Sequence, residues 1–407
     1  MILRADARWL PLKDGVVNCV VTSPPYWALR DYGVAPSAWG GEPSCEHAWE
    51  ETERHEAYTG KTRWQHTTKG RGEEQPDEKR LRTSTTRETR PEAWGALAQG
   101  AFCTKCGAWK GVLGLEPSPD LYVEHLIQIF REVRRVLRDD GTLWLNLGDC
   151  YHSGDRGGYR LDSHRWEGSE IQSGYRDRGG SGIPLAPNRL PQAGLKDKDL
   201  VGIPWRVAFA LQAEGWWLRS DIVWSKPNPM PESITDRPTK SHEYVFLLAK
   251  SKIYYYDAEA IKEPWSSDRE DMARLGAPRS GAAYLSQAKV PDNSSKQDAV
   301  CKRTYKGFNS RWKVNPPTSM ARNKRTVWTI PTQPYSGAHF ATFAEKLVRL
   351  CILAGCPPGG FVLDPFAGSG TVGKVAIEEG RVPVLCDLAY QALAIARLRN
   401  VQMKLSS

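Results

Sequence analysis

The stretch Val20-Val21-Thr22-Ser23-Pro24-Pro25-Tyr26-Trp27 decides how the rest of the chain is interpreted. Its apolar run predicts a buried strand that breaks into a rigid turn. Pro24 and Pro25 have fixed φ angles and restrict the residues before them, so Ser23 and the neighbouring carbonyls are held in one orientation. The ring of Tyr26 lies beside these acceptors, as a site needs when it stacks on a planar base and binds its amino group. A proline-rich turn after any buried strand is the alternative.

A second stretch, Gly360-Phe361-Val362-Leu363-Asp364-Pro365-Phe366-Ala367-Gly368-Ser369-Gly370-Thr371, predicts a nucleotide-type crevice. A short apolar strand ends at Asp364, a glycine-rich turn follows, and a helix begins at Thr371. Gly368 and Gly370 permit close approaches that a Cβ would block, so an adenosyl or amino-acid moiety can lie against the turn. A tight turn without a ligand is the alternative for this glycine pair. The pair alone is therefore weak evidence for a binding site, and only the two stretches together are specific.

Together, TSPPYW and DPFAGSGT resemble the amino-group DNA methyltransferases, in the permuted arrangement where the catalytic motif precedes the cofactor motif. The resemblance implies S-adenosylmethionine as cofactor. It also implies a doubly wound, Rossmann-like α/β fold with seven mostly parallel strands, of which the last pair is antiparallel. The catalytic residues it implies are Ser23, Pro24, Pro25 and Tyr26. The residues it places at the cofactor are Asp6, Thr22, His339, Phe340, Phe343, Asp364, Phe366, Gly368, Gly370, Thr371 and Asp387.

Three acids have two interpretations each. Asp6 follows the first strand and either touches the cofactor's adenine, as in the resembled family, or caps a surface turn. Asp387 ends its strand where such folds place an acid on the ribose hydroxyls, and a capping role is the alternative. Asp149 also follows a strand, and is either a site residue or a turn former.

Apolar periodicity predicts the elements of the core. Helices are expected at 121–137, where Asp120 is placed to cap, and at 201–214, 346–354, 371–379 and 390–400. Strands are expected at 2–5, up to Ser23, and at 142–147, 216–224, 244–249, 360–364 and 382–386. The loop between the strands at 216–224 and 244–249 is too short for a crossover helix, which predicts an antiparallel return.

Composition divides the chain into core and insertions. The catalytic half is expected at 1–38, an insertion at 39–111, further core at 112–257 with a mobile loop at 152–198, a target-recognition insertion at 258–330, and the cofactor half at 331–407.

The first insertion carries four residues of the zinc-ligand type in two close pairs, Cys45 with His47 and Cys103 with Cys106. Bound zinc can supply about 10 kcal/mol or more of folding energy, which an insertion with little apolar content needs. The pattern therefore predicts a structural zinc site. Four ordinary residues are the alternative, and a redox pair is disfavoured because no thioredoxin-like unit surrounds it.

The latter half of the second insertion is one-sided in charge, since no acid occurs between Ala299 and Ala344. Basic residues interleaved with aromatic ones are typical of nucleic-acid surfaces, and the resembled family places its target-recognition region here. A solvated charged face is the alternative. With two residues of the 225–233 loop, the expected DNA-binding residues are Lys226, Asn228, Lys302, Arg303, Lys306, Arg311, Trp312, Lys313, Arg322, Lys324 and Arg325.

The net charge of +9 and a pI near 9.0 suit a polyanionic partner, here double-stranded DNA. Nine scattered cysteines argue against a disulfide framework and fit a reducing compartment. No signal peptide or membrane-spanning run is evident. We expect a cytoplasmic protein without a membrane partner, bacterial or phage-encoded, and the oligomeric state stays open, with a monomer compatible.

The chemistry expected is methyl transfer to a nucleobase amine, whose lone pair is delocalised into the ring. Hydrogen bonds from the amine to the Ser23 hydroxyl and the Pro24 carbonyl would orient that lone pair. Ser23, where many relatives carry Asp or Asn, favours the cytosine N4 amine of a flipped base over the adenine N6 amine. The adenine N6 methyltransferase is the first alternative, and a non-catalytic zinc-containing DNA-binding protein is the second. An RNA or small-molecule methyltransferase would not need the long basic insertions.

Overall fold

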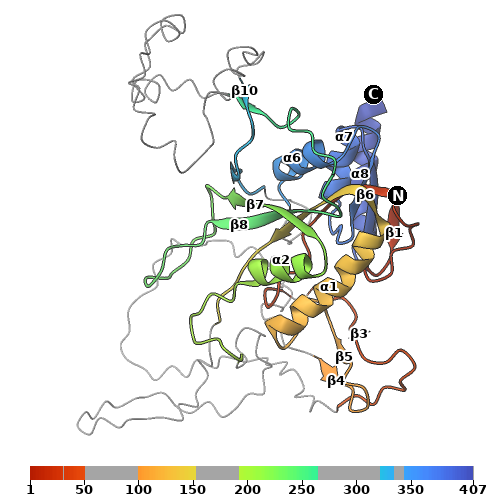
Figure 1. Ribbon diagram of the computed structural model, residues 1–407, viewed down its shortest axis with the longest axis vertical. Helices are drawn as coiled ribbons and strands as arrows, with labels where there is room; N and C mark the ends of the chain where they lie inside the picture. Colours follow the sequence, from red (N-terminus) through yellow and green to blue (C-terminus); the bar gives the residue numbers. More distant parts are fainter. Residues whose placement is uncertain (31, 51–99, 153–191, 265–320, 334–342, 407) are drawn as a thin grey trace, which may run out of the picture.

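A single mixed sheet forms the centre of the computed structural model, which describes residues 1–30, 32–50, 100–152, 192–264, 321–333 and 343–406 (Figure 1). The strand order is β1-β13-β12-β2-β6-β8-β7-β11. In chain order these strands are β1 (Ile2–Arg4), β2 (Val17–Thr22), β6 (Leu137–Leu147), β7 (Trp217–Ser225), β8 (His242–Ala249), β11 (Val327–Thr329), β12 (Phe361–Asp364) and β13 (Val382–Asp387).

Only β8 runs against its neighbours in this sheet. It is antiparallel to both β6 and β7, and the other adjacent pairs are parallel. The antiparallel return between β7 and β8 is therefore confirmed, whereas the expected total of seven strands is wrong. The eighth strand is β11, whose Trp328 is buried against the sheet. Three residues at the end of a basic segment show no periodicity, which is why the pattern does not predict this strand.

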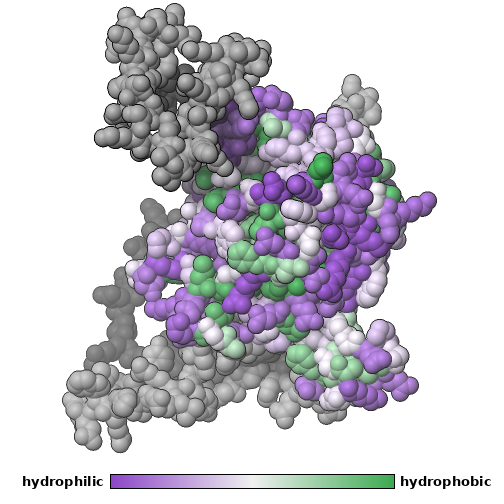
Figure 2. Space-filling view, viewed as in Figure 1, coloured by the Kyte–Doolittle hydropathy of each residue, from purple (hydrophilic) through white to green (hydrophobic). Residues whose placement is uncertain are grey.

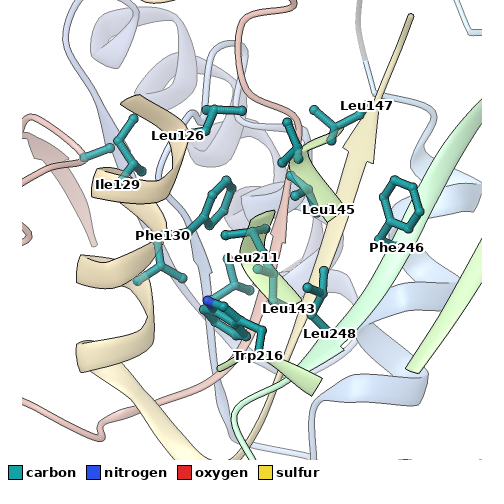
Figure 3. Close-up of a cluster of buried hydrophobic side chains, with 14 of the residues drawn as sticks. Leu126, Ile129, Phe130, Leu143, Leu145, Leu147, Leu211, Trp216, Phe246 and Leu248 are labelled. Carbon is teal, nitrogen blue, oxygen red and sulfur yellow. The ribbon is translucent and has the colours of Figure 1, made fainter. Parts of the chain in front are cut away.

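Helices cover both faces of the sheet (Figure 1). Leu143 and Leu145 of β6 belong to the apolar cluster that includes α1 (Pro119–Val136) and α2 (Ile203–Ala213), as Figure 3 shows. Trp144, between them, belongs to the opposite cluster, which includes α6 (Glu345–Gly355) and α7 (Thr371–Glu378). Helix α8 (Gln391–Ser406) contacts β1 and α7. The alternation of one strand between two cores is the pattern of a doubly wound sheet, as expected.

The helix starts differ in detail from the prediction. Ser118, not Asp120, caps α1, since its side chain accepts a hydrogen bond from the Leu121 backbone N–H. Asp120 lies in the first turn of α1 and pairs with Arg206. Asp149 accepts hydrogen bonds from the backbone N–H groups at the start of α2, which supports its structural interpretation.

The described ends of the first insertion pack on the core. Strands β3 (Ser37–Trp39), β4 (Ala101–Phe102) and β5 (Trp109–Gly111) form a small antiparallel sheet. Trp39 and Trp109 stack on the His125 ring of α1, at 4.6 and 5.3 Å between ring centroids. Residues 51–99 lie outside the described residues, as do most of the loop expected at 152–198 and most of the second insertion. The domain boundaries given above stay predictions.

The described surface is mostly hydrophilic on the face that Figure 2 shows, with apolar residues scattered over it. None of the helices in the described part of the chain has the length and apolar content to cross a bilayer. None of the described cysteines forms a disulfide.

Candidate active site

The sheet topology brings the candidate residues to one edge. Strands β2, β12 and β13 are parallel, so the segments that follow their carboxyl ends meet there. Ser23 follows β2, Phe366 lies just beyond β12, and Asp387 is the last residue of β13. Strand β8 runs in the opposite direction, so its first residues, including Glu243, reach the same edge.

A pocket of about 600 Å³ lies at this edge. Tyr26 and Phe366 both line it, so the two motifs from the extremities of the chain share one cavity. Among the residues expected at the site, those lining the pocket are Asp6, Ser23, Pro24, Pro25, Tyr26, Lys226, Asn228, Phe343, Asp364, Phe366, Gly368, Thr371 and Asp387. Thr22 and Gly370 are buried and do not line the pocket, although their chain neighbours Ser23, Ser369 and Thr371 do. His339 and Phe340 lie outside the described residues.

Asp364 joins the two halves of the pocket. The Thr22 hydroxyl donates to Asp364 Oδ1 at 2.7 Å, and the Phe366 backbone N–H donates to the same oxygen at 3.1 Å. Burial raises the pKa of the Asp364 carboxyl to about 7, although the Thr22 hydrogen bond opposes the increase. The acid is therefore in the range where its charge changes near neutral pH.

The glycine-rich turn is held by Asp387. Its Oδ2 accepts from the Gly368 backbone N–H at 2.8 Å, and its Oδ1 accepts from the N–H groups of Ala389 and Tyr390, each at 2.8 Å. These backbone contacts support the capping role of Asp387. Asp387 also lines the pocket, so its binding to the ribose hydroxyls stays a proposal. Asp6 likewise combines both features, since it lines the pocket and pairs with Arg8 at 2.7 Å.

The start of α7 has the features of an anion site. Gly370 precedes it with a φ of 77°, a left-handed conformation that favours glycine, and offers no side-chain cap. The first backbone N–H groups of the helix lack acceptors within it, so a carboxylate can bind them. With the volume of the pocket and Phe343 and Phe366 in its lining, these residues fit S-adenosylmethionine, the cofactor that the resemblance implies.

At the other end of the pocket lies a polar network. Ser23 Oγ donates to Tyr26 Oη at 3.2 Å, and Tyr26 Oη donates to Glu243 Oε2 at 2.8 Å. Asn146 Nδ2 donates to Tyr26 Oη at 2.6 Å and to Glu243 Oε2 at 3.0 Å, and the Lys226 ammonium pairs with Glu243 Oε1. Burial, followed by the Glu243 charge, raises the pKa of Tyr26 well above its ordinary value, so it is a neutral phenol.

Sequence reasoning missed Asn146 and Glu243. Asn146 lies within an apolar run and Glu243 at the start of a strand, so neither belongs to a local motif. The sequence did contain one signal for Glu243. The hairpin of the strands at 216–224 and 244–249 was predicted, and an acid at the start of its antiparallel strand must lie at the same edge as the carboxyl ends of the parallel strands. The Pro25 carbonyl, in turn, accepts from the Tyr122 hydroxyl of α1 at 2.8 Å, which fixes the Pro24-Pro25 turn on the core.

The candidate DNA-binding residues have unexpected partners. Lys226 lies over the Trp224 ring at 4.4 Å and faces Glu243, inside the pocket. Asn228 accepts from the Thr332 backbone N–H at 3.0 Å. Three basic residues near the end of the second insertion converge on Glu263, which lies near the start of the same insertion. They are Arg322 at 2.9 Å, Lys324 at 3.5 Å and Arg325 at 2.7 Å.

These ion pairs offset part of the one-sided charge in the latter half of the second insertion. Glu263 belongs to β9 (Glu263–Pro264), which pairs with β10 (Ala321–Arg322) and so joins the two ends of the insertion. The other six candidate DNA-binding residues, five basic and one aromatic, fall outside the described residues. They are Lys302, Arg303, Lys306, Arg311, Trp312 and Lys313.

A candidate metal centre forms away from the pocket lining. Cys45, His47, Cys103 and Cys106 offer ligand atoms that all lie within 4.8 Å of one another. Cys45 Sγ and Cys103 Sγ are 4.0 Å apart, and Cys106 Sγ and His47 Nδ1 are 3.4 Å apart. Ligands about 2.0–2.3 Å from a tetrahedral zinc lie roughly 3.3–3.8 Å from each other, so the four residues fit zinc.

The thiol chemistry of this cluster also suits a metal. Burial raises the pKa of Cys103, but hydrogen bonds from the backbone N–H groups of Cys106 and Lys105 and from the His47 side chain outweigh that effect and lower it to about 6. The thiolate, which is the form that binds metals, is then the main species at neutral pH. The backbone links the cluster to the small sheet, because Cys103 N donates to the Ala108 carbonyl at 2.7 Å.

Known proteins resemble the chain along most of its length. A family model described as DNA methylase, for N6 and N4 methyltransferases, matches residues 17–397. The Type II methyltransferase M.SmaI of Serratia marcescens is 41% identical over 99% of this chain and 91% of its own. The Type II methyltransferase M.Cfr9I of Citrobacter freundii is 37% identical over 96% of this chain and 83% of its own.

Among solved structures, the PvuII DNA methyltransferase, titled cytosine-N4-specific, covers 98% of this chain and 85% of its own, with a TM-score of 0.46 and 14% identity. The family assignment rests on the sequence matches, which extend across both motifs of the shared pocket. The chain belongs to the DNA methylase family of amino-group (N6 and N4) methyltransferases.

Proposed function

We propose that this methyltransferase transfers the methyl group of S-adenosylmethionine to the exocyclic N4 amine of a cytosine flipped out of double-stranded DNA, at a specific sequence. The observation that carries the proposal is the single pocket lined by both Tyr26 and Phe366. It has room for a methyl donor on the glycine-rich side and a planar base on the proline side.

The residues that would hold the cofactor follow from the contacts at the glycine-rich side. The N-terminus of α7 suits the carboxylate of the methionine moiety, and Phe366 suits the adenine ring. Asp6 and Asp387 line the same region and offer carboxylate oxygens to the hydroxyl and amino groups of the nucleoside. When bound, S-adenosylmethionine supplies an activated methyl group, so no covalent enzyme intermediate is required.

The target side offers acceptors to an amine. The Ser23 hydroxyl donates to Tyr26 Oη, which leaves the lone pairs of Ser23 Oγ available to an N–H of the base. The Pro24 carbonyl is the second acceptor. Asn146 Oδ1 is buried and has no hydrogen-bond partner in the described part of the chain. An unpaired buried oxygen costs about 1–3 kcal/mol, and a donor on a bound base would remove that cost.

Ser23 is the reason for favouring cytosine. The hydroxyl is a neutral acceptor, and in the resembled family this position carries Asp or Asn in many members. The adenine N6 amine is the second candidate target, because the matching family includes both N6 and N4 enzymes. The Type II names of the two relatives support a role as the modification enzyme of a restriction-modification system.

Double-stranded DNA is the substrate that the charge supports. The chain carries a net charge of +9, and basic residues of the second insertion such as Arg325 remain exposed enough to meet phosphates. The pairs with Glu263 hold the base of that insertion together. Lys226, by contrast, belongs to the pocket and would meet the flipped base instead of the duplex.

The test is methylation of duplex DNA of mixed sequence with a labelled methyl donor, followed by nucleoside analysis and sequencing of the modified position. We expect N4-methylcytosine at one defined sequence. N6-methyladenine would replace the cytosine assignment. DNA binding without any labelled base, in a protein that holds zinc, would instead favour the non-catalytic DNA-binding protein.

A further inference from the structure

A chain of hydrogen bonds links Ser23 to Tyr26 and Glu243. Orientation of the target amine requires only the acceptors at Ser23 and Pro24, so the rest of this chain has no role in that step. It runs from Ser23 Oγ to Tyr26 Oη over 3.2 Å and from Tyr26 Oη to Glu243 Oε2 over 2.8 Å. Each link donates in the same direction, away from the turn and toward the carboxylate. Such an arrangement moves a proton over its full length when each group passes on its own proton.

The Glu243 carboxylate, at the end of this hydrogen-bond chain, is fixed in position by two further contacts. Asn146 Nδ2 donates to its Oε2, and the Lys226 ammonium pairs with its Oε1. The amide orientation of Asn146 follows from chemistry, since its oxygen would repel the carboxylate. The Glu243 side chain is 17% exposed, so solvent reaches it. The lining of the pocket includes Ser23, Tyr26 and Glu243 together.

We propose that Glu243 is the terminal acceptor of the proton that the target amine loses during methyl transfer, with Ser23 and Tyr26 as the relay. This inference rests on the proposed function. The amine nitrogen forms a bond to the methyl carbon as the sulfur–carbon bond breaks, which leaves a positive charge on the nitrogen. Its N–H proton passes to Ser23 Oγ, the Ser23 proton to Tyr26 Oη, and the Tyr26 proton to Glu243 Oε2.

The products of this sequence balance. The methylated base is neutral, Ser23 and Tyr26 are again protonated, and Glu243 is a neutral carboxylic acid that later releases its proton to solvent. The raised pKa of Tyr26 fits a phenol that passes a proton on and does not rest as phenolate. The cations facing Glu243 are Lys226 in direct contact and Lys240 at longer range.

The decisive experiment compares the wild type with Glu243→Gln in single-turnover methylation over a range of pH, in H₂O and D₂O. The amide keeps the shape but accepts no proton. We expect the transfer rate to fall by about 100-fold or more, the usual contribution of general-base catalysis. The wild-type rate should rise with pH to a plateau and show a normal solvent isotope effect, and the variant should lack both features. Calorimetric binding of the cofactor should be unchanged.

Two further variants keep the inference testable. Tyr26→Phe retains the ring but removes the middle of the relay, and should lose the same pH dependence and isotope effect. Glu214→Gln removes a carboxylate paired with Arg131 on the surface, and should behave as wild type. A Tyr26→Phe variant with the wild-type rate and pH profile would overturn the relay, even if Glu243→Gln is unstable.

The failure of the relay is distinct from failure of the proposed function. A wild-type protein that transfers no methyl group to DNA refutes the function itself. An active wild type, with Glu243→Gln retaining its rate, pH profile and isotope effect, refutes only the proton path.

Discussion

Replacement of Asp364 by Asn should change how the stability of the protein depends on pH. The wild-type carboxyl is 3% exposed, and burial raises its pKa from 3.8 to about 7. The folded state binds the Asp364 proton more tightly than the unfolded chain does, so this proton contributes to the free energy of unfolding. The contribution is complete below pH 3.8 and is lost as the pH rises through about 7.

The expected size follows from the two values. The interval between 3.8 and about 7 corresponds to about 4 kcal/mol, at about 1.4 kcal/mol for each factor of ten. Asp364→Asn keeps the size of the side chain and cannot titrate. The free energy of unfolding of the variant should therefore rise relative to wild type by up to about 4 kcal/mol between about pH 4 and about pH 7.5.

Urea unfolding at several pH values, without cofactor, measures this difference. Subtracting the two proteins removes the contribution of the other titrating groups, provided that the slope with urea stays the same. Asp139→Asn, which makes the same chemical change at a carboxylate that is 93% exposed, is the matched control. A difference between Asp364→Asn and wild type that stays constant over this range would show that Asp364 titrates as an ordinary carboxyl, and the reasoning would be wrong.

Three other substitutions test the two halves of the pocket and the metal centre. Ser23→Ala should lower the methyl-transfer rate by about 10²–10³-fold while calorimetric cofactor affinity stays unchanged, and an unaltered turnover rate would contradict the role of the hydroxyl. Gly148→Ala places a Cβ 2.5 Å from the Tyr26 ring and should shift that ring, and a displacement of about 1 Å costs about 10²-fold in rate. Full activity of that variant would show that the ring position is not critical. Cys103→Ser should lose zinc by elemental analysis and lower the unfolding temperature, and absence of zinc from the wild type would refute the metal centre.

The sequence by itself determined the family, the cofactor motif and most of the core elements. Pro24 and Pro25 constrain a turn locally, and glycine-rich turns such as that at Gly368 require backbone freedom locally, so each motif is visible without knowledge of its partner. The four zinc-type ligands were predicted in the same way, from their two close spacings, and the structure brings them together.

Only the tertiary structure decided which side chains complete the site. Asn146 and Glu243 come from the end of one strand and the start of its antiparallel neighbour, and they meet because those two strands pair. Glu263 likewise offsets basic residues from the far end of the second insertion. Contacts of this kind depend on strand order and direction, and residues far apart in the chain carry no local pattern that predicts them.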